Sequence, residues 1–182
     1  MHIRPLSLGG VFEIALEPRC DERGYFLRTY DEAISAQANL VTHWVQENQA
    51  LSLRKGILRG LHFQKPPHTE TKLIRVVRGA ILDVFVDLRR SSPTFGQWAA
   101  VELSEDNYKA VYIPKGFAHG YCTLTEVSVV LYKVDTVYAP YAEGGIRWND
   151  GDISILWPVQ HPITSAKDAS LPLLRDFVTP FD

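Results

Sequence analysis

Residues 59–64, with the sequence RGLHFQ, combine residue types that could bind a ligand and move a proton. They lie in a β-type run, Ile57 to Phe63, so alternate side chains should point to opposite faces. His62 and Gln64 then share a face with Gly60, where the missing side chain lets a ligand approach closely. Arg59 falls on the opposite face and reaches His62 only from a strand end or a bulge. This face predicts the lining of a polar cavity, with a hydrogen-bonded core histidine as the alternative.

Other residues along the chain could share acid–base chemistry with His62, namely Lys72, His119, Tyr132 and Asp168. A carboxylate orients a histidine and makes it a better base. A lysine ammonium can stabilise an enolate oxygen, and a tyrosine can deliver a proton to the opposite face of the carbon. Each residue alone could instead be a surface lysine, a buried histidine, a rim tyrosine or a helix cap. Together they indicate proton transfer at a carbon next to a carbonyl.

A metal site is the second interpretation of the same residues. Many jelly-roll proteins of the cupin class bind iron or manganese through His-x-His, a carboxylate and a third histidine. Here these positions are His62, Gln64, Glu70 and His119, so glutamine replaces one histidine. Two histidines and one carboxylate can still hold Fe(II). Because Gln64 weakens the site and Lys72 would repel a dication, we rank a metal-dependent oxygenase or isomerase second.

Short strand-like segments separated by turns must position these residues. They cover residues 11–16, 25–30, 44–49, 51–53, 57–63, 72–77, 81–88, 97–103, 110–113, 120–124 and 127–134. Turns recur roughly every 8–12 residues, which is typical of an all-β sandwich or barrel. Helix candidates are Asp31 to Leu40, with Asp31 as N-cap, and Leu171 to Phe177. We therefore predict one all-β domain over residues 1–182, a double-sheet jelly-roll barrel with a few short peripheral helices.

Composition argues against several classes of protein. The net charge of −2 does not indicate a nucleic-acid-binding surface, and no apolar run approaches the roughly 20 residues of a membrane span. Cys20 and Cys122 lie far apart in no metal-binding spacing, which favours reduced thiols. The residues after Met1 lack the apolar core of a signal peptide. We expect a cytoplasmic protein without nucleic-acid or membrane partners.

Blocks of sequence along nearly the whole chain match a known family. They occupy residues 21–26, 46–48, 56–64, 72–79, 87–94, 114–120, 131–133, 145–150, 157–158 and 162–168. In this order and spacing the chain resembles the dTDP-4-dehydrorhamnose 3,5-epimerase family. The resemblance implies a cupin-like jelly roll that works without a metal or cofactor, as a homodimer exchanging N-terminal strands. The implied reaction is epimerisation at C3, C5 or both of dTDP-4-keto-6-deoxyglucose through an enolate, in dTDP-L-rhamnose or related deoxysugar biosynthesis.

The resemblance also implies roles for individual residues. His62 is the general base held by Asp168, Tyr132 is the acid, and Lys72 stabilises the enolate. Arg23 and Arg59 match diphosphate contacts, in keeping with the fit of guanidinium to phosphate. Tyr138 matches a residue that stacks on the base, and further substrate-contacting positions are Phe26, Gln46, Glu47, Asn48, His119, Glu143 and Lys167. A solvated turn residue remains the alternative for Glu143, and an internal ion pair for Arg59.

Arg28 departs from the family pattern, which usually has a substrate-contacting glutamate at this position. The reversed charge leads us to expect that Arg28 adjusts or relocates a nucleotide contact. A titration of the Arg28→Glu variant with dTDP should therefore give a changed dissociation constant. An unchanged affinity would contradict this expectation.

Overall fold

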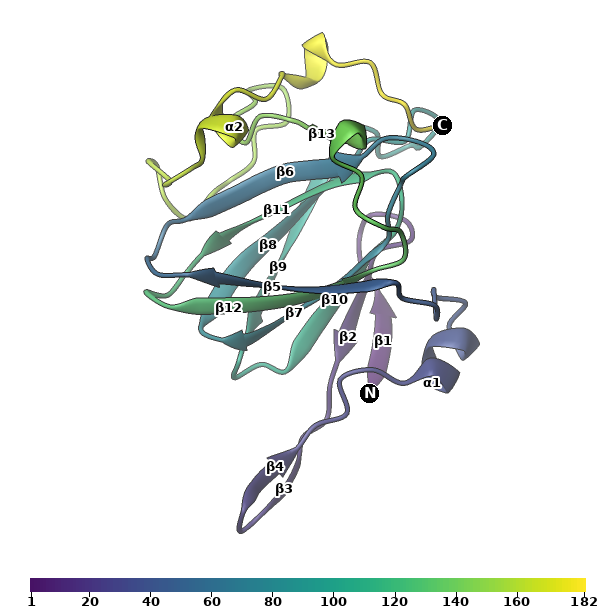
Figure 1. The fold of residues 1–182 in the computed structure, drawn as a ribbon, viewed down its shortest axis with the longest axis vertical. Helices are drawn as coiled ribbons and strands as arrows, with labels where there is room; N and C mark the ends of the chain where they lie inside the picture. The colour runs from purple at the N-terminus through teal and green to yellow at the C-terminus, as the bar shows by residue number, and fades with distance from the viewer.

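Two antiparallel sheets face each other in this computed structural model, which describes residues 1–182 (Figure 1). The strands are β1 His2–Pro5, β2 Phe12–Ala15, β3 Arg19–Asp21, β4 Gly24–Phe26, β5 Gln46–Ser52, β6 Leu58–Gln64, β7 Lys72–Arg78, β8 Ala80–Asp87, β9 Trp98–Ser104, β10 Lys109–Ile113, β11 Phe117–Thr123, β12 Ser128–Val134 and β13 Glu143–Gly145. The larger sheet has the order β1-β2-β10-β7-β12-β5, and the smaller one β13-β6-β11-β8-β9. The β3–β4 hairpin pairs with neither sheet and extends away from the body (Figure 1).

The helical segments are short and peripheral, as predicted. They are α1 Glu32–Gln37, η1 Pro140–Ala142, α2 Ala166–Ala169 and η2 Leu174–Asp176. Asp31 caps α1 through a hydrogen bond from the backbone N–H of Ile34. The helix predicted over residues 171–177 shrinks to the single 3-10 turn η2. No helix is long and apolar enough to cross a membrane.

Most predicted strands are confirmed with small shifts at their ends, and three short strands were not anticipated. The strand predicted over residues 25–30 is wrong beyond Phe26, and the segments 44–49 and 51–53 form the single strand β5. β1 is an edge strand of four residues that pairs with the next strand, β2, as in the pair His2 and Ala15. β3 occupies a segment with a turn-like composition, and β13 is held by pairing with β6. Segments this short carry too little alternation to be recognised, because their stability comes from the strand beside them.

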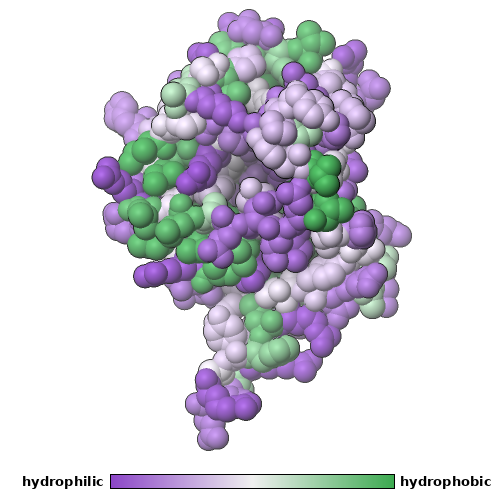
Figure 2. All heavy atoms as spheres, viewed as in Figure 1, coloured by the Kyte–Doolittle hydropathy of each residue, from purple (hydrophilic) through white to green (hydrophobic).

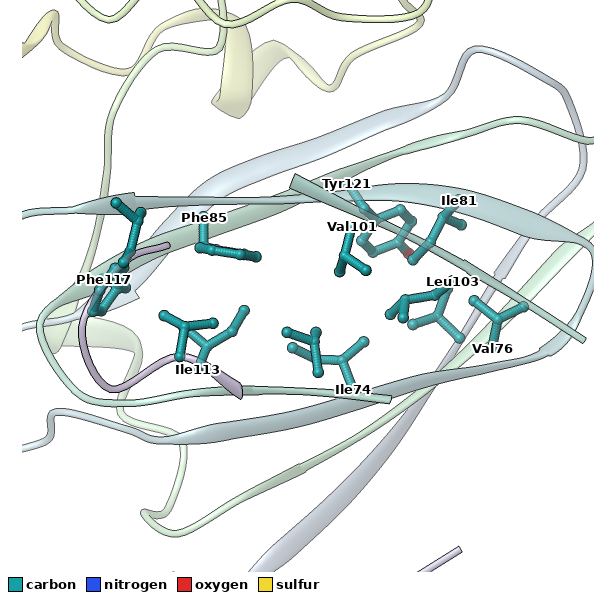
Figure 3. Close-up of a cluster of buried hydrophobic side chains, with 13 residues drawn as sticks. Ile74, Val76, Ile81, Phe85, Val101, Leu103, Ile113, Phe117 and Tyr121 are labelled. Carbon is teal, nitrogen blue, oxygen red and sulfur yellow. The ribbon is translucent and has the colours of Figure 1, made fainter. Parts of the chain in front are cut away.

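Apolar clusters lie on both faces of each sheet. Between the sheets, Ile74 and Ile113 of the larger sheet pack with Phe85 and Leu103 of the smaller one (Figure 3). A second cluster on the outer face of the smaller sheet is covered by C-terminal residues such as Phe181. A third cluster lies on the outer face of the larger sheet. The interior cluster involves β7 to β11 most heavily, which leaves the space between β6 and the β5–β12 pair for polar side chains.

Asp87 is a fully buried carboxylate that fixes the loop after β8. It accepts hydrogen bonds from the backbone N–H, Nε and Nη2 of Arg89 at 3.0, 2.9 and 2.7 Å. The hydroxyls of Ser92 and Thr94 donate to it at 2.6 and 2.7 Å. Burial raises the pKa of Asp87, but these donors outweigh burial and lower the pKa to about 2. The ionised carboxylate therefore stabilises the folded protein.

Replacing Asp87 with Asn should destabilise the protein by roughly 2 kcal/mol at pH 7. Because the folded-state pKa is depressed, this stabilisation is complete above the unfolded-state pKa near 3.8 and is lost as the pH falls toward 2. Urea unfolding of both proteins at pH 7 and near pH 3 measures the difference, which should shrink at the lower pH. Asp106→Asn, at an exposed turn, is the control. Equal stability of Asp87→Asn and the parent at pH 7 would refute this role.

Candidate active site

A cavity of about 720 Å³ lies between β6 and the β5–β12 pair of the facing sheet. This volume falls within the roughly 300–1,000 Å³ typical of small-molecule sites. Most of the predicted site residues line it, namely Gln46, Asn48, Arg59, His62, Lys72, His119, Tyr132, Tyr138, Glu143, Lys167 and Asp168. Residues from both sheets and from the C-terminal segment thus meet in one polar chamber.

His62 and Asp168 form a hydrogen-bonded pair in this cavity. The Nε2 atom of His62 lies 2.7 Å from Oδ1 of Asp168, and the backbone N–H of Gly60 donates to Oδ2 at 3.1 Å. The hydroxyl of Ser165 caps α2 by accepting a hydrogen bond from the backbone N–H of Asp168. Burial raises the pKa of Asp168, but the hydrogen bonds from His62 and the Gly60 backbone N–H help to outweigh burial, so the net shift is downward. An ionised Asp168 can therefore orient the imidazole.

A bulge in β6 brings Arg59 to the same side as His62. β11 pairs His119 with His62 and Tyr121 with Arg59, which leaves two residues of β6 opposite the single residue Gly120. The extra residue reverses the alternation, so Arg59 lines the cavity together with His62. A bulge was one of the two ways in which the sequence allowed Arg59 to reach the His62 side. Gly60 has a φ of +120°, and a Cβ there would lie 2.6 Å from the Cα of Gly120. Only glycine fits this close approach of two strands.

Lys72 and Tyr132 enter the cavity from the opposite sheet. Tyr132 lies opposite Ile74 in the pairing of β12 with β7, and Lys72 lies opposite Val134. Both side chains therefore point inward, two positions apart along the strands. Burial raises the pKa of the Tyr132 phenol, and the negative charge of Glu70 raises it further. A protonated phenol and the His62 imidazole thus line the cavity from opposite sheets.

Four predicted residues form a hydrogen-bonded network elsewhere along the cavity wall. Nζ of Lys167 lies 2.6 Å from Oε2 of Glu143, and the hydroxyl of Tyr138 donates to the same oxygen at 3.0 Å. The backbone N–H of Tyr138 donates to the side-chain oxygen of Gln46. Burial raises the pKa of Glu143, but the bonds from Lys167 and Tyr138 lower it overall. These residues hold the η1 and α2 segments against β5.

The candidate metal ligands have separate partners. His62 bonds to Asp168, Nε2 of His119 lies 2.8 Å from Oδ2 of Asp83, and Glu70 lies 3.2 Å from Nζ of Lys72. No three histidine, cysteine, aspartate or glutamate side chains gather closely enough to hold a metal ion. The arrangement therefore does not favour the metal-dependent interpretation.

Comparison with known proteins agrees with this geometry. The family described as dTDP-4-dehydrorhamnose 3,5-epimerase matches residues 5–176. The chain belongs to this epimerase family. The epimerase of that name from Methanothermobacter thermautotrophicus is 46% identical over 173 residues, which cover 93% of this chain and 92% of the relative.

Solved structures of the family superpose closely on this chain. The Bacillus anthracis epimerase, crystallised with TDP and PPi, is 45% identical with a TM-score of 0.92, covering 95% of this chain and 99% of that one. The Legionella pneumophila epimerase, in complex with dTDP-4-keto-L-rhamnose, is 37% identical with a TM-score of 0.91, covering 96% and 93%. The cupin-like jelly roll and the isomerase class predicted for this epimerase are therefore confirmed.

Three residues predicted to contact substrate lie outside the cavity of this epimerase chain. Arg23 pairs with Asp21 on the β3–β4 hairpin, whose tip is hydrophilic (Figure 2). Phe26, on the same hairpin, is 63% exposed. Glu47 points to the outer face of β5, where its carboxylate lies 3.1 Å from Nζ of Lys133. Substrate contact by these three residues stays a prediction.

Arg28 also lies outside the cavity. Its Nη1 atom lies 2.9 Å from Oδ2 of Asp31, the N-cap residue of α1. In this epimerase chain the arginine at the family's glutamate position therefore has a local acidic partner. Its expected effect on nucleotide binding stays a prediction.

Some cavity residues were not predicted to act in this reaction. Gln64 and Glu70 line the cavity. Gln64 was predicted to lie on the His62 face, but beyond that both residues were considered only as metal ligands. Tyr121 also lines it and shares the inward alternation of His119 on β11, so the alternation could have identified Tyr121. Ser165 could be recognised from sequence only as a possible helix cap, because α2 has just four residues.

Proposed function

We propose that this enzyme epimerises dTDP-4-keto-6-deoxyglucose at C3, C5 or both, through an enolate, in dTDP-L-rhamnose or related deoxysugar biosynthesis. The observation that supports this most directly is the arrangement of the cavity. A histidine–aspartate pair lies on the wall formed by the smaller sheet, and a phenol and an ammonium project from the larger sheet. A base and an acid on opposite walls suit the inversion of a carbon centre between them.

His62 is the base that removes the proton. Its Nε2 atom bonds to the ionised Asp168, so Nε2 carries the hydrogen and Nδ1 has a free lone pair. Nδ1 is therefore the atom that accepts the proton from the sugar carbon. Asp168 then stabilises the imidazolium that forms.

Lys72 and Tyr132 act on the intermediate. As the proton leaves, negative charge develops on the carbonyl oxygen at C4, where the Lys72 ammonium stabilises it. The Tyr132 phenol, protonated because its pKa is raised, donates a proton to the other face of the enolate. Deprotonation from one wall followed by reprotonation from the other inverts the centre. Each proton-transfer group contributes roughly 10²–10⁴-fold to the rate.

Proton NMR in D₂O with dTDP-4-keto-6-deoxyglucose tests these assignments. The parent enzyme should incorporate deuterium at C3, C5 or both, which also identifies the inverted centres. His62→Ala should lose this exchange by roughly 10²–10⁴-fold while still binding dTDP. Tyr132→Phe should continue to remove the proton but fail to form the correct epimer. Full epimerisation by both variants would rule out the mechanism.

We further propose that this single jelly-roll domain works as a cytoplasmic homodimer. Arg23 and Phe26 lie on a hairpin that extends away from its own cavity (Figure 1). The hairpin exposes Tyr25 and Phe26, large apolar side chains suited to an interface. A hairpin that reaches the neighbouring protomer would bring Arg23 to that protomer's cavity. The exposed Cys20 thiol on the same hairpin suits a reducing compartment.

Mixed dimers can test this arrangement. Arg23→Ala and His62→Ala should each lower activity as homodimers. If Arg23 serves the neighbouring cavity, denaturing and refolding the two variants together should recover activity, because each mixed dimer contains one intact site. Arg19→Ala, an exposed arginine on the same hairpin, should retain parent activity. If the mixtures are no more active than the two variant homodimers, Arg23 contributes to the cavity of its own chain or lies outside the site.

A further inference from the structure

Glu70 is a carboxylate in the cavity with no role in the steps above. It lies in the loop between β6 and β7, and its side chain is only 14% exposed. Oε1 lies 3.2 Å from Nζ of Lys72, and Oε2 accepts a hydrogen bond from Nε2 of Gln64 at 3.1 Å. Each oxygen therefore has its own buried partner. Such an arrangement fixes both the position and the direction of the carboxylate.

Gln64 clamps this carboxylate to the strand that carries His62. The glutamine is buried, and its amide nitrogen also donates to the backbone oxygen of His68 at 3.1 Å. Its amide oxygen accepts from the backbone N–H of Ala139 at 2.7 Å. One side chain thus connects β6, the Glu70 loop and the segment before η1. Only an amide offers donor and acceptor groups side by side for these partners.

Glu70 is also the carboxylate that balances the charge of Lys72. The Lys72 side chain is 11% exposed, and a buried ammonium is costly unless an opposite charge lies close by. Glu70 is the acidic residue within ion-pair distance of Nζ. An ammonium has three N–H donors, so one bond to Glu70 leaves others for the substrate oxygen. Lys72 is therefore held in place before the substrate arrives.

The same carboxylate influences Tyr132. Burial is the largest cause of the raised pKa of Tyr132, followed by the charge of Glu70. Glu143 and Tyr138 also raise the pKa, whereas Arg59 lowers it. The other charged or titratable groups around the cavity are His62 with Asp168 on one wall, His119 and Tyr121 on β11, Lys72 on β7 and Lys167 on α2.

We infer that Glu70, clamped by Gln64, is a positioning residue that fixes the Lys72 ammonium beside the developing enolate oxygen and keeps a negative charge near the Tyr132 phenol. This inference rests on the proposed function. Glu70 touches neither the sugar carbon nor the transferred proton in this scheme, and it acts through Lys72 and Tyr132. This inference also assigns a role to Gln64, which holds Glu70 in place. Gln64 occupies the position where a metal-binding cupin would have a histidine.

Glu70→Gln tests the inference because it keeps the size of the side chain and removes its charge. We expect kcat to fall by up to roughly 10²-fold through misplacement of Lys72, with little change in KM. Tyr132 must be protonated to act, so activity is lost as the pH rises through its pKa. Without the Glu70 charge that pKa is raised less, and the alkaline limb of the kcat profile should move to lower pH.

Glu70→Asp separates charge from position. The shorter side chain keeps the negative charge but cannot reach both Lys72 and Gln64. It should keep the alkaline limb near that of the parent while kcat stays reduced. Glu126→Gln, at an exposed turn, is the matched control and should behave like the parent.

The outcomes distinguish this inference from the proposed function. Parent kcat and an unshifted pH profile in Glu70→Gln, with His62→Ala inactive, would overturn the inference and leave the proposed function intact. Normal activity in His62→Ala would instead overturn the proposed function. If thermal unfolding shows that Glu70→Gln does not fold, Glu70→Asp decides: a reduced kcat with unchanged KM supports the inference, and parent kcat overturns it.

Discussion

The hydrogen bond between His62 and Asp168 is the contact on which the rest of the site depends. It joins β6 to a helix of four residues near the C-terminus, across 106 positions of the chain. Asp168 is almost completely buried, and a buried carboxylate is tolerated only when donors surround it. The imidazole of His62 and the backbone N–H of Gly60 supply these donors. The same contact therefore stabilises the buried Asp168 carboxylate and makes His62 a better base.

The two sheets divide the chemistry between them. The smaller sheet carries the base and Arg59, while the larger one carries the ammonium and the phenol. Each sheet packs against an apolar cluster on its outer face. Moving either sheet would therefore disrupt the close packing of its cluster. The distance between base and acid is thus set by sheet packing. Glu70 and Gln64 extend this organisation to the loop that connects β6 to β7.

The sequence predicted the regular part of this structure well. The segment 81–88 was expected as a strand, and its alternation accounts for Val84 and Val86 on the outer face and Phe85 between the sheets. The meeting of His62 with Asp168 was expected from family resemblance, because local patterns carry no information about such distant contacts. Strands such as β1 and β13 were missed, since pairing rather than composition makes them strands. The Gln64 clamp was also missed, because it joins the Glu70 side chain to backbone atoms of two separate loops.

The contact between Gly60 and Gly120 has a further consequence for how β6 finds its register. A strand that slipped by one residue against β11 would turn His62 toward the apolar outer cluster and expose Leu61 to the cavity. In the observed register a Cβ on either glycine would lie 2.6 Å from backbone of the opposite strand, so this close contact requires two residues without side chains. In this register His62 lies opposite His119. The absence of side chains at Gly60 and Gly120 thus permits the strand register that directs His62 into the cavity.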